Sequence, residues 1–342
     1  MTSSATRRRA SGRVTLSDVA RAADVSPITV SRALRGERAV DPALVERVRE
    51  AADRLGYVPD PAARALASRR STHVAVLIPM LSNALFVDLI EAVQRTLRPA
   101  GFQTLIGVTH YDEAEEAALL REQLLHRPAG LLVTGIDRPA ATRTLIAQAG
   151  VPCVHMMDLA PAKSGLHSVG LSQADAGAAL TKHLLRHGRR RVAFAAAQLD
   201  PRTLQRLQGW RRELTAAGLY DQTLEWLNPA PSSIALGGRM FEQIIGQRPA
   251  IDAIFFCNDD LAQGALLAAL RRGIKVPDEI AVAGFNDLTG SDQMVPPLTT
   301  VRTPRAEVGE AASAMLLALM RGEAVKQPAV DLGFELIARG SA

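Results

Sequence analysis

Polar side chains that could bind a ligand stand directly after several buried apolar runs of this 342-residue chain. The runs read HVAVLIP, VPCVHMM, RVAFAAA, DAIFFC and EIAVAGF, which is typical of strands in a parallel sheet that is covered on both faces. Open parallel sheets bind ligands beyond the carboxyl ends of their strands. The ligand-binding candidates are therefore the residues that follow these runs: Ser82, Asn83, Phe86, Asp158, Arg202, Arg206, Asn258, Asp260 and Asn286.

The chemistry available to these side chains is binding rather than catalysis. Carboxylates such as Asp260 could serve in acid/base catalysis, but no nucleophile or cofactor motif accompanies them, and binding of hydroxyl groups is enough to explain them. His183 and His187 stand four residues apart, yet HLLRH lacks the glutamate of a zinc protease, so we expect a solvated helix end. Gly237 and Gly238 do not form a phosphate loop. The sequence predicts no enzyme, no cofactor and no metal site.

Alternating strand and helix patterns from His73 onward indicate an α/β domain with parallel sheets. The pattern restarts after a link at 167–171, which predicts two similar lobes. The expected helices are 83–97, 113–126, 139–149, 174–187, 203–217, 234–245, 261–272 and 305–320, and a last strand is expected at 329–336. We place the domain at 72–342, with lobe one at 72–171 plus 302–328 and lobe two at 172–301 plus 329–342.

A helical module precedes this domain, at 13–58. Thr15 followed by Asp18 is a capping box that begins a first helix, which we expect to end at Asp24. Ser26 and then Pro27 begin a second helix, so the pair is a helix-turn-helix. A third amphipathic helix, capped by Asp41, runs to Gly56. Three small helices can bury one core and leave the second free to lie in a DNA major groove.

The positive charge of the chain belongs to this N-terminal part. Residues 1–70 contain fourteen arginines, no lysine and eight acidic residues, a net charge of +6, whereas the whole chain carries +5. Neutralising phosphates requires such an excess. Residues 1–12 are small, polar and basic, which predicts a disordered arm, and 59–71 predicts a linker containing one or two turns of helix.

The same module resembles the DNA-binding headpiece of the lactose/galactose (LacI/GalR) repressor family. The resemblance lies in T-x-x-D-V-A-x-x-A-x-V-S-x-x-T-V-S-R from Thr15 to Arg32, followed by L-G-Y-x-P and A-x-x-L-A. It implies an all-α headpiece followed by a bilobed, periplasmic-binding-protein-like α/β domain that closes on an effector. It also implies a homodimer on double-stranded operator DNA, with the linker as a hinge helix whose Leu66 wedges into the minor groove.

Further segments resemble the gluconate-operon repressors within that family: LDPRT, FCNDDLAQGA, TPR and DLGFELIARGS. The resemblance adds Arg305, from TPR, to the effector-binding candidates. Two arginines, Arg202 and Arg305, would suit a carboxylate better than a neutral sugar, which favours gluconate or a related sugar acid. The alternatives are a surface position at a helix start for Arg202 and a salt bridge between the lobes for Arg305.

DNA contacts are assigned by the same resemblance. Pro27 and Ile28 occupy the positions that usually vary with operator sequence, and neither side chain can form a hydrogen bond, so readout there rests on apolar contact with a thymine methyl. Arg32 is the candidate for a guanine contact. Asp60 either weakens DNA affinity or caps the hinge helix. The full set of DNA-binding candidates is Thr15, Ser26, Pro27, Ile28, Thr29, Ser31, Arg32, Arg35, Tyr57, Ala63 and Leu66.

Two other classes of protein fit the sequence less well. A periplasmic sugar-binding protein would share the bilobed body, but the N-terminus lacks the apolar core of a secretory signal, so we expect a bacterial cytoplasmic protein associated with the nucleoid and not with a membrane. An enzyme would need the catalytic groups that are missing.

Cys153 and Cys257 stand in apolar runs and are expected to be small buried thiols. No leucine heptad follows Leu336, which favours a dimer over a tetramer. Inducer and corepressor logic both remain open.

Overall fold

The computed structural model describes residues 14–34, 40–58, 71–248 and 250–342. The chain divides into two compact units, 1–70 and 71–342, and each is described here by itself. The predicted basic arm and the predicted hinge helix, with Asp60, Ala63 and Leu66, lie outside the described residues. Arg35, between the second and third helices, also lies outside them.

The described part of the first unit is helical, as the capping residues predict. It contains α1 (Leu16–Ala22), α2 (Pro27–Leu34) and α3 (Pro42–Leu55). The Thr15–Asp18 capping box forms in both directions, and α3 ends at Gly56 with a left-handed φ of 64°. α1 ends two residues before the predicted Asp24, which has a φ of 50° and makes the turn. Apolar side chains of all three helices form the core: Val19, Ala20, Ala23, Val30, Ala33, Val48, Ala51 and Ala52.

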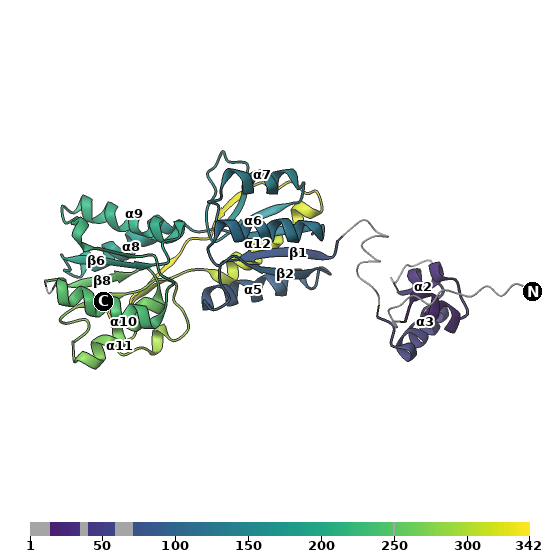
Figure 1. Cartoon of the computed structure of the whole chain (residues 1–342), viewed down its shortest axis with the longest axis horizontal. Coiled ribbons are helices and arrows are strands. Elements are labelled where there is room, and N and C mark those ends of the chain that lie inside the picture. Colours follow the sequence, from purple (N-terminus) through teal and green to yellow (C-terminus); the bar gives the residue numbers. More distant parts are fainter. Residues whose placement is uncertain (1–13, 35–39, 59–70, 249) are drawn as a thin grey trace, which may run out of the picture. The chain divides into compact units, whose positions relative to one another are not determined.

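Lobe one of the second unit is a parallel sheet covered on both faces (Figure 1). Its strand order is β11-β5-β4-β3-β1-β2. Two helices, α5 (Ala84–Leu97) and α12 (Arg305–Met320), pack on one face of the sheet. Two others, α6 (Glu113–Leu125) and α7 (Ala140–Gln148), pack on the other face. The strands are β1 (His73–Ile78), β2 (Gln103–Val108), β3 (Gly130–Thr134), β4 (Cys153–Met156), β5 (His167–Gly170) and β11 (Ala329–Asp331).

Lobe two repeats this plan with a sheet in the order β7-β6-β8-β9. Its strands are β6 (Val192–Ala197), β7 (Glu225–Asn228), β8 (Ala253–Phe256) and β9 (Ala281–Ala283), and its helices are α8 (Gln173–Arg186), α9 (Pro201–Ala216), α10 (Ile234–Gln247) and α11 (Asp259–Arg272). Short 3₁₀ turns lie at Gln222–Leu224 and Ser291–Gln293. α8 packs closely on α9 because Gly209 lacks a side chain, and a Cβ there would lie 2.0 Å from the carbonyl oxygen of Ala174. Gly237 of α10 meets the backbone of Leu261 in the same way, so it is a packing residue.

The structure overturns four of the expectations. Residues 167–171, predicted as a link, contain β5, which pairs with both β4 and β11 in the interior of the sheet. The predicted strand 329–336 is two strands: β11 belongs to lobe one, and β12 (Glu335–Ile337) pairs antiparallel with β10 (Thr300–Arg302) where the chain crosses between lobes. The boundary drawn at 328 is therefore too early. His183 is buried rather than solvated, with its ring centroid 4.2 Å from that of His187.

Candidate functional site

A narrow cavity lies between the lobes where the carboxyl ends of their strands meet. It has about 670 Å³ of space free of protein atoms, part of it open to solvent, but the centre of a water molecule can reach only about 60 Å³. The lobes are therefore close together around it. The candidates that line the cavity are Ser82, Asn83, Phe86, Arg202, Arg206, Asn258, Asp260 and Asn286.

These side chains reach the cavity because several helices begin there, shortly after a strand ends. Asn83 caps α5, and its side chain accepts a hydrogen bond from the backbone N–H of Leu85 at 3.0 Å. Asn258 caps α11 in the same way, and its amide nitrogen also donates to the Ser232 hydroxyl at 2.8 Å. Arg202 and Arg206 lie one turn apart in α9, so both guanidinium groups reach the same cavity.

Arg206 is buried without a carboxylate partner. Its Nε donates to Gln173 Oε1 at 2.8 Å, its Nη1 donates to the carbonyl oxygen of Cys257 at 2.6 Å, and its guanidinium lies 4.0 Å from the centre of the Phe285 ring. Burial lowers the pKa of Arg206, and the negative charge of Asp200 offsets only part of this. Within the described part of the chain it forms no ion pair. A buried cation that only neutral groups contact is suited to an anionic ligand.

Arg202 differs, because it already has a counter-ion. Its Nη2 lies 3.1 Å from Asp200 Oδ1, and it also contacts the hydroxyl of Tyr111. Burial opposes the charge of Arg202, but Asp200, Tyr111 and Asp158 together more than offset this, and the pKa of Arg202 is raised. Burial and Asp200 together raise the pKa of Tyr111 to about 12, so its hydroxyl is protonated at neutral pH.

Two acceptors in the cavity have hydrogen-bonding capacity to spare. Asn286 is 2% exposed, and its Oδ1 is buried without a hydrogen-bond partner in the described part of the chain. Asp260 is half-buried, which raises the pKa of its carboxyl, and no described side chain or backbone N–H bonds to it. Such acceptors favour a ligand that carries hydroxyl groups.

Asp158 and Arg305 lie elsewhere than the sequence analysis expected. Asp158 is buried beside the cavity, where its carboxylate accepts from the backbone N–H of Leu159 at 2.9 Å, and Met157 lines the cavity in its place. Arg305 lines a separate hollow, where it forms an ion pair with Asp88 at 2.8 Å. This ion pair joins two helices of lobe one, so it is not the salt bridge between the lobes that the sequence left open for Arg305.

Several residues that line the cavity are not among the ligand-binding candidates named from the sequence. Asp200 caps α9 and follows β6 closely, so the rule that places ligands at strand ends also applies to it. Tyr111 follows β2, so the same strand-end rule could have found it. Met80 and Gln198 also follow strands, β1 and β6. Only Leu85, Thr203 and Ser232 come from helices or loops with no comparable signal.

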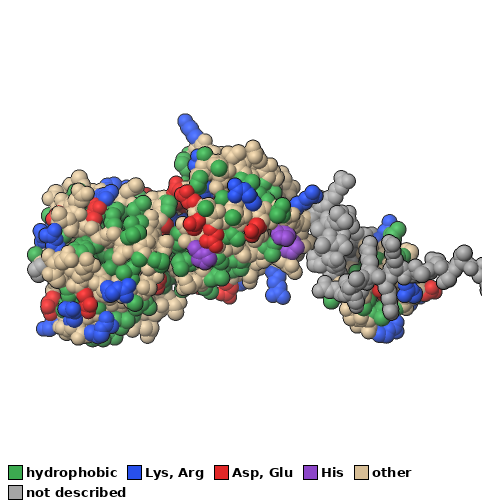
Figure 2. Space-filling model, viewed as in Figure 1, with side chains coloured by type: hydrophobic (Ala, Val, Ile, Leu, Met, Phe, Trp, Pro, Cys, Tyr) green, Lys and Arg blue, Asp and Glu red, His purple; other side chains and the backbone are tan. Residues whose placement is uncertain are grey.

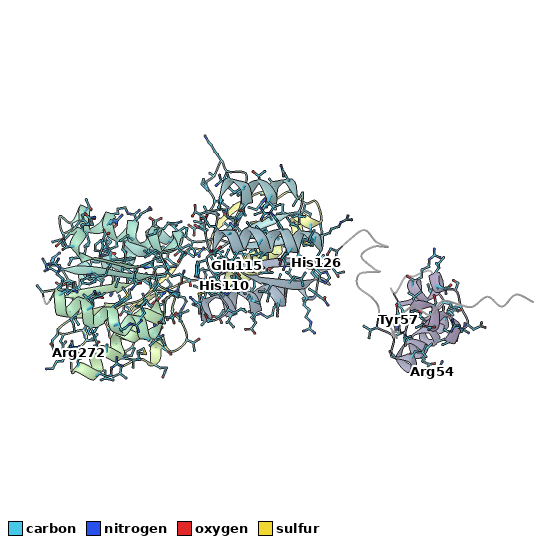
Figure 3. All side chains as sticks on the ribbon, viewed as in Figure 1. Arg54, Tyr57, His110, Glu115, His126 and Arg272 are labelled. Atoms are coloured by element: carbon cyan, nitrogen blue, oxygen red, sulfur yellow. The ribbon has the colours of Figure 1, made fainter. Side chains whose placement is uncertain are left out.

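In the headpiece, most of the described DNA-binding candidates lie in α2 or directly before it. Ser26 Oγ accepts from the backbone N–H of Thr29 at 3.1 Å, and Pro27 and Ile28 are exposed, Ile28 at 66%. Arg32 is also exposed, and Ser31 is half-buried. Thr15 caps α1, and Tyr57, labelled in Figure 3, follows α3 and packs against the headpiece core.

The surface agrees with a body that carries little net charge. Figure 2 shows acidic and basic side chains interspersed over the body in this view.

Within the described residues, no cluster of three or more His, Cys, Asp or Glu side chains could hold a metal ion. No described helix is long and apolar enough to cross a membrane. Burial raises the pKa of the free thiols, to about 12 for Cys153 and to about 11 for Cys257.

Models of known protein families match both the headpiece and the α/β body of the chain. Residues 15–60 match the family model of bacterial regulatory proteins of the lacI family, and residues 181–342 match a periplasmic binding protein-like domain. The HTH-type transcriptional regulator GntR of Pseudomonas aeruginosa is 56% identical over 333 residues, which is 97% of each chain. The chain belongs to the LacI family. This LacI-family member is a DNA-binding transcriptional repressor and not an enzyme.

Solved structures of the family share the fold. The transcription regulator GntR from Chromobacterium violaceum is 47% identical, with a TM-score of 0.77 over 79% of this chain and 98% of that one. The lac repressor dimer bound to operator and an anti-inducer is 25% identical, with a TM-score of 0.84 over 96% of this chain and 99% of that one. The helix-turn-helix headpiece and the bilobed α/β body expected from the sequence are confirmed.

Proposed function

We propose that this repressor is a homodimer whose affinity for operator DNA is controlled by an open-chain sugar acid, gluconate, bound between the lobes. The observation that carries the choice of an acid is the buried Arg206 guanidinium, which forms no ion pair with a carboxylate of the described chain. A bound carboxylate would supply the missing charge and accept a hydrogen bond from Nη2, the guanidinium nitrogen that Gln173 and Cys257 leave available. The regulator names of the relatives are consistent with this effector.

The residues that grip the acid are revised from the sequence-based pair. Arg206 replaces Arg305 as the principal anchor, and Arg202 stands beside it in the cavity wall with its charge shared with Asp200. The hydroxyl groups of the sugar chain have acceptors in Asp260 and in Asn286 Oδ1. A ligand with a carboxylate at one end and hydroxyl groups along its length would satisfy all of these groups.

For operator recognition we propose that α2 lies in the major groove. The exposed Ile28 would read a thymine methyl, Arg32 would read a guanine, and the hydroxyl groups of Ser26, Thr29 and Ser31 with Thr15 would face phosphates. The roles of Arg35, Tyr57, Ala63 and the Leu66 wedge stay predictions. A dimer would present two headpieces to a palindromic operator on the cytoplasmic nucleoid.

The deciding experiment is calorimetric titration of the full-length protein with gluconate, with glucose as the neutral control. Binding of gluconate without glucose would support the carboxylate site, and binding of neither would refute the choice of effector. Operator affinity is then measured with and without gluconate, on a duplex selected from random sequences. A fall identifies an inducer and a rise identifies a corepressor. Sedimentation of a tetramer would contradict the dimer.

A further inference from the structure

Arg305, at the first position of α12, contacts the turn that carries Asn286. Its Nη1 donates to the carbonyl oxygen of Asn286 and, at 3.3 Å, to that of Asp287. Its Nε donates to Asp88 Oδ2 at 2.9 Å. Asp88 lies in α5 of lobe one, whereas the turn follows β9 of lobe two. One guanidinium therefore joins two lobe-one helices to a lobe-two turn.

The turn that receives Arg305 has an unusual backbone. Asn286 has a φ of 111° and Asp287 a φ of 52°, a region that residues other than glycine rarely adopt. Neighbouring groups hold this conformation. The backbone N–H of Asn286 donates to the carbonyl oxygen of Val301 at 2.8 Å, and the buried carboxylate of Asp259 accepts from the backbone N–H of Leu288 at 2.6 Å.

The Asp287 side chain fixes the turn from the opposite direction. Its Oδ2 accepts from Arg302 Nε at 2.9 Å and its Oδ1 lies 2.8 Å from Arg339 Nη2. Arg302 and Arg339 belong to the chain segments that cross between the lobes. The amide and the carboxylate of the turn are thus held by lobe two and the crossing strands, whereas Arg305 holds its carbonyl oxygens from lobe one.

The conformation matters because Asn286 lines the cavity with an Oδ1 that has no partner in the described chain. The direction of that oxygen depends on the backbone of the turn, and the backbone carbonyl of the same residue is an Arg305 acceptor. A charge-assisted hydrogen bond to that carbonyl is among the stronger contacts available to fix it.

We propose that Arg305 is a positioning residue for ligand binding, which acts through Asn286 instead of touching the ligand. By tying the Asn286–Asp287 turn to Asp88, it aims Asn286 Oδ1 into the cavity and makes this aim depend on the relative position of the two lobes. The proposal rests on the proposed function for the identity of the ligand, but the geometry of the turn can be tested without a ligand.

The first test is hydrogen exchange of the backbone amides of Asn286, Asp287 and Leu288 in the full-length protein without ligand. Arg305→Lys keeps the charge but loses the fork that reaches Asp88 and two carbonyl groups together. We expect several-fold faster exchange at these amides. The matched control is Arg95→Lys, because Arg95 also pairs α5 with α12, through Glu310 at 3.6 Å, but no contact joins it to the turn.

The second test is a double-mutant cycle with gluconate binding measured by calorimetry. Loss of one hydrogen bond in Asn286→Ala should weaken binding about tenfold, and Arg305→Lys should weaken it about fivefold. If Arg305 acts only through Asn286, the double variant binds about tenfold more weakly than the wild type and not fiftyfold. Arg95→Lys should bind like the wild type.

Several outcomes would overturn the proposal: unchanged exchange of the turn amides in Arg305→Lys, equal acceleration in Arg95→Lys, or additive losses in the cycle. Failure of the wild type to bind gluconate would refute the effector instead, and the exchange data would still decide whether Arg305 holds the turn. If Arg305→Lys does not fold, Asp88→Ala serves in both tests, since it removes the acceptor in α5 and leaves the arginine in place.

Discussion

Replacement of Arg206 by glutamine tests the charge that distinguishes a sugar acid from a neutral polyol. The change removes the cation but retains a polar amide of smaller size at a position that is 5% exposed. We expect gluconate to bind far more weakly, while D-glucitol, the open-chain polyol without a carboxylate, changes little. The comparison therefore isolates the contribution of the guanidinium to carboxylate binding.

The expected magnitude follows from the contacts of the guanidinium. Nε and Nη1 are engaged with Gln173 and with the carbonyl oxygen of Cys257, which leaves Nη2 to face the ligand. A hydrogen bond between charged groups contributes about 1.5–3 kcal/mol. One such bond corresponds to a loss of gluconate affinity of roughly 10- to 150-fold, since about 1.4 kcal/mol is a factor of ten.

The stability of the variant must be followed as well. Loss of the donors to Gln173 and Cys257 costs about 1–3 kcal/mol for each acceptor left unpaired, and removal of a buried unpaired cation offsets part of this. Thermal unfolding reports the net change, and calorimetry with gluconate and D-glucitol reports binding. If the preference for gluconate over D-glucitol stays within threefold of the wild-type preference, Arg206 does not hold the carboxylate and the reasoning is wrong.

Three further predictions concern other parts of the molecule. Ile28→Ser should change which bases a selection from random duplexes recovers, while the salt dependence of DNA binding, which reports phosphate contacts, stays the same. Gly209→Ala should lower the free energy of unfolding of the body by at least 2 kcal/mol in denaturant titration, because its Cβ meets the Ala174 carbonyl oxygen; a near-neutral effect would contradict the close packing of α8 and α9. Burial and then the charge of Arg138 lower the pKa of His155 to about 4 in the folded chain. As the pH falls, the imidazole of His155 is therefore protonated in the unfolded chain at a higher pH than in the folded chain. The stability linked to His155 is present above pH 6.5 and falls by about 2 kcal/mol at pH 5, and His155→Gln should lack this loss in urea titrations at the two pH values.

Local signals were sufficient where a structure depends on neighbours along the chain. The Thr15–Asp18 capping box and the Gly56 C-cap mark helix ends that the structure confirms, because each satisfies backbone groups within four residues of itself. The short strands β5 and β11 were missed or misplaced for the opposite reason. Three or four residues carry little periodicity, and these strands exist because they pair with distant segments of the sheet.

In the candidate site too, local signals predicted some features, and contacts between distant segments decided others. Strand ends and helix caps placed Asn83, Asn258 and the α9 arginines at the cavity, since the carboxyl ends of parallel strands must meet at one edge of a sheet. Arg202 and Arg206 are one turn apart and identical in type, yet only the tertiary structure pairs Asp200 with Arg202 and leaves Arg206 without an ion pair in the described chain.

Sequence alone thus determined the modules, most helices and the set of side chains available to a ligand, because these depend on short-range pattern and on the amino-acid types themselves. Only the tertiary structure decided which arginine faces the cavity unpaired and that Arg305 turns toward Asp88 and the Asn286 turn. A long side chain can reach several directions from one backbone position, and its choice depends on partners more than 200 residues away, such as Asp88 for Arg305.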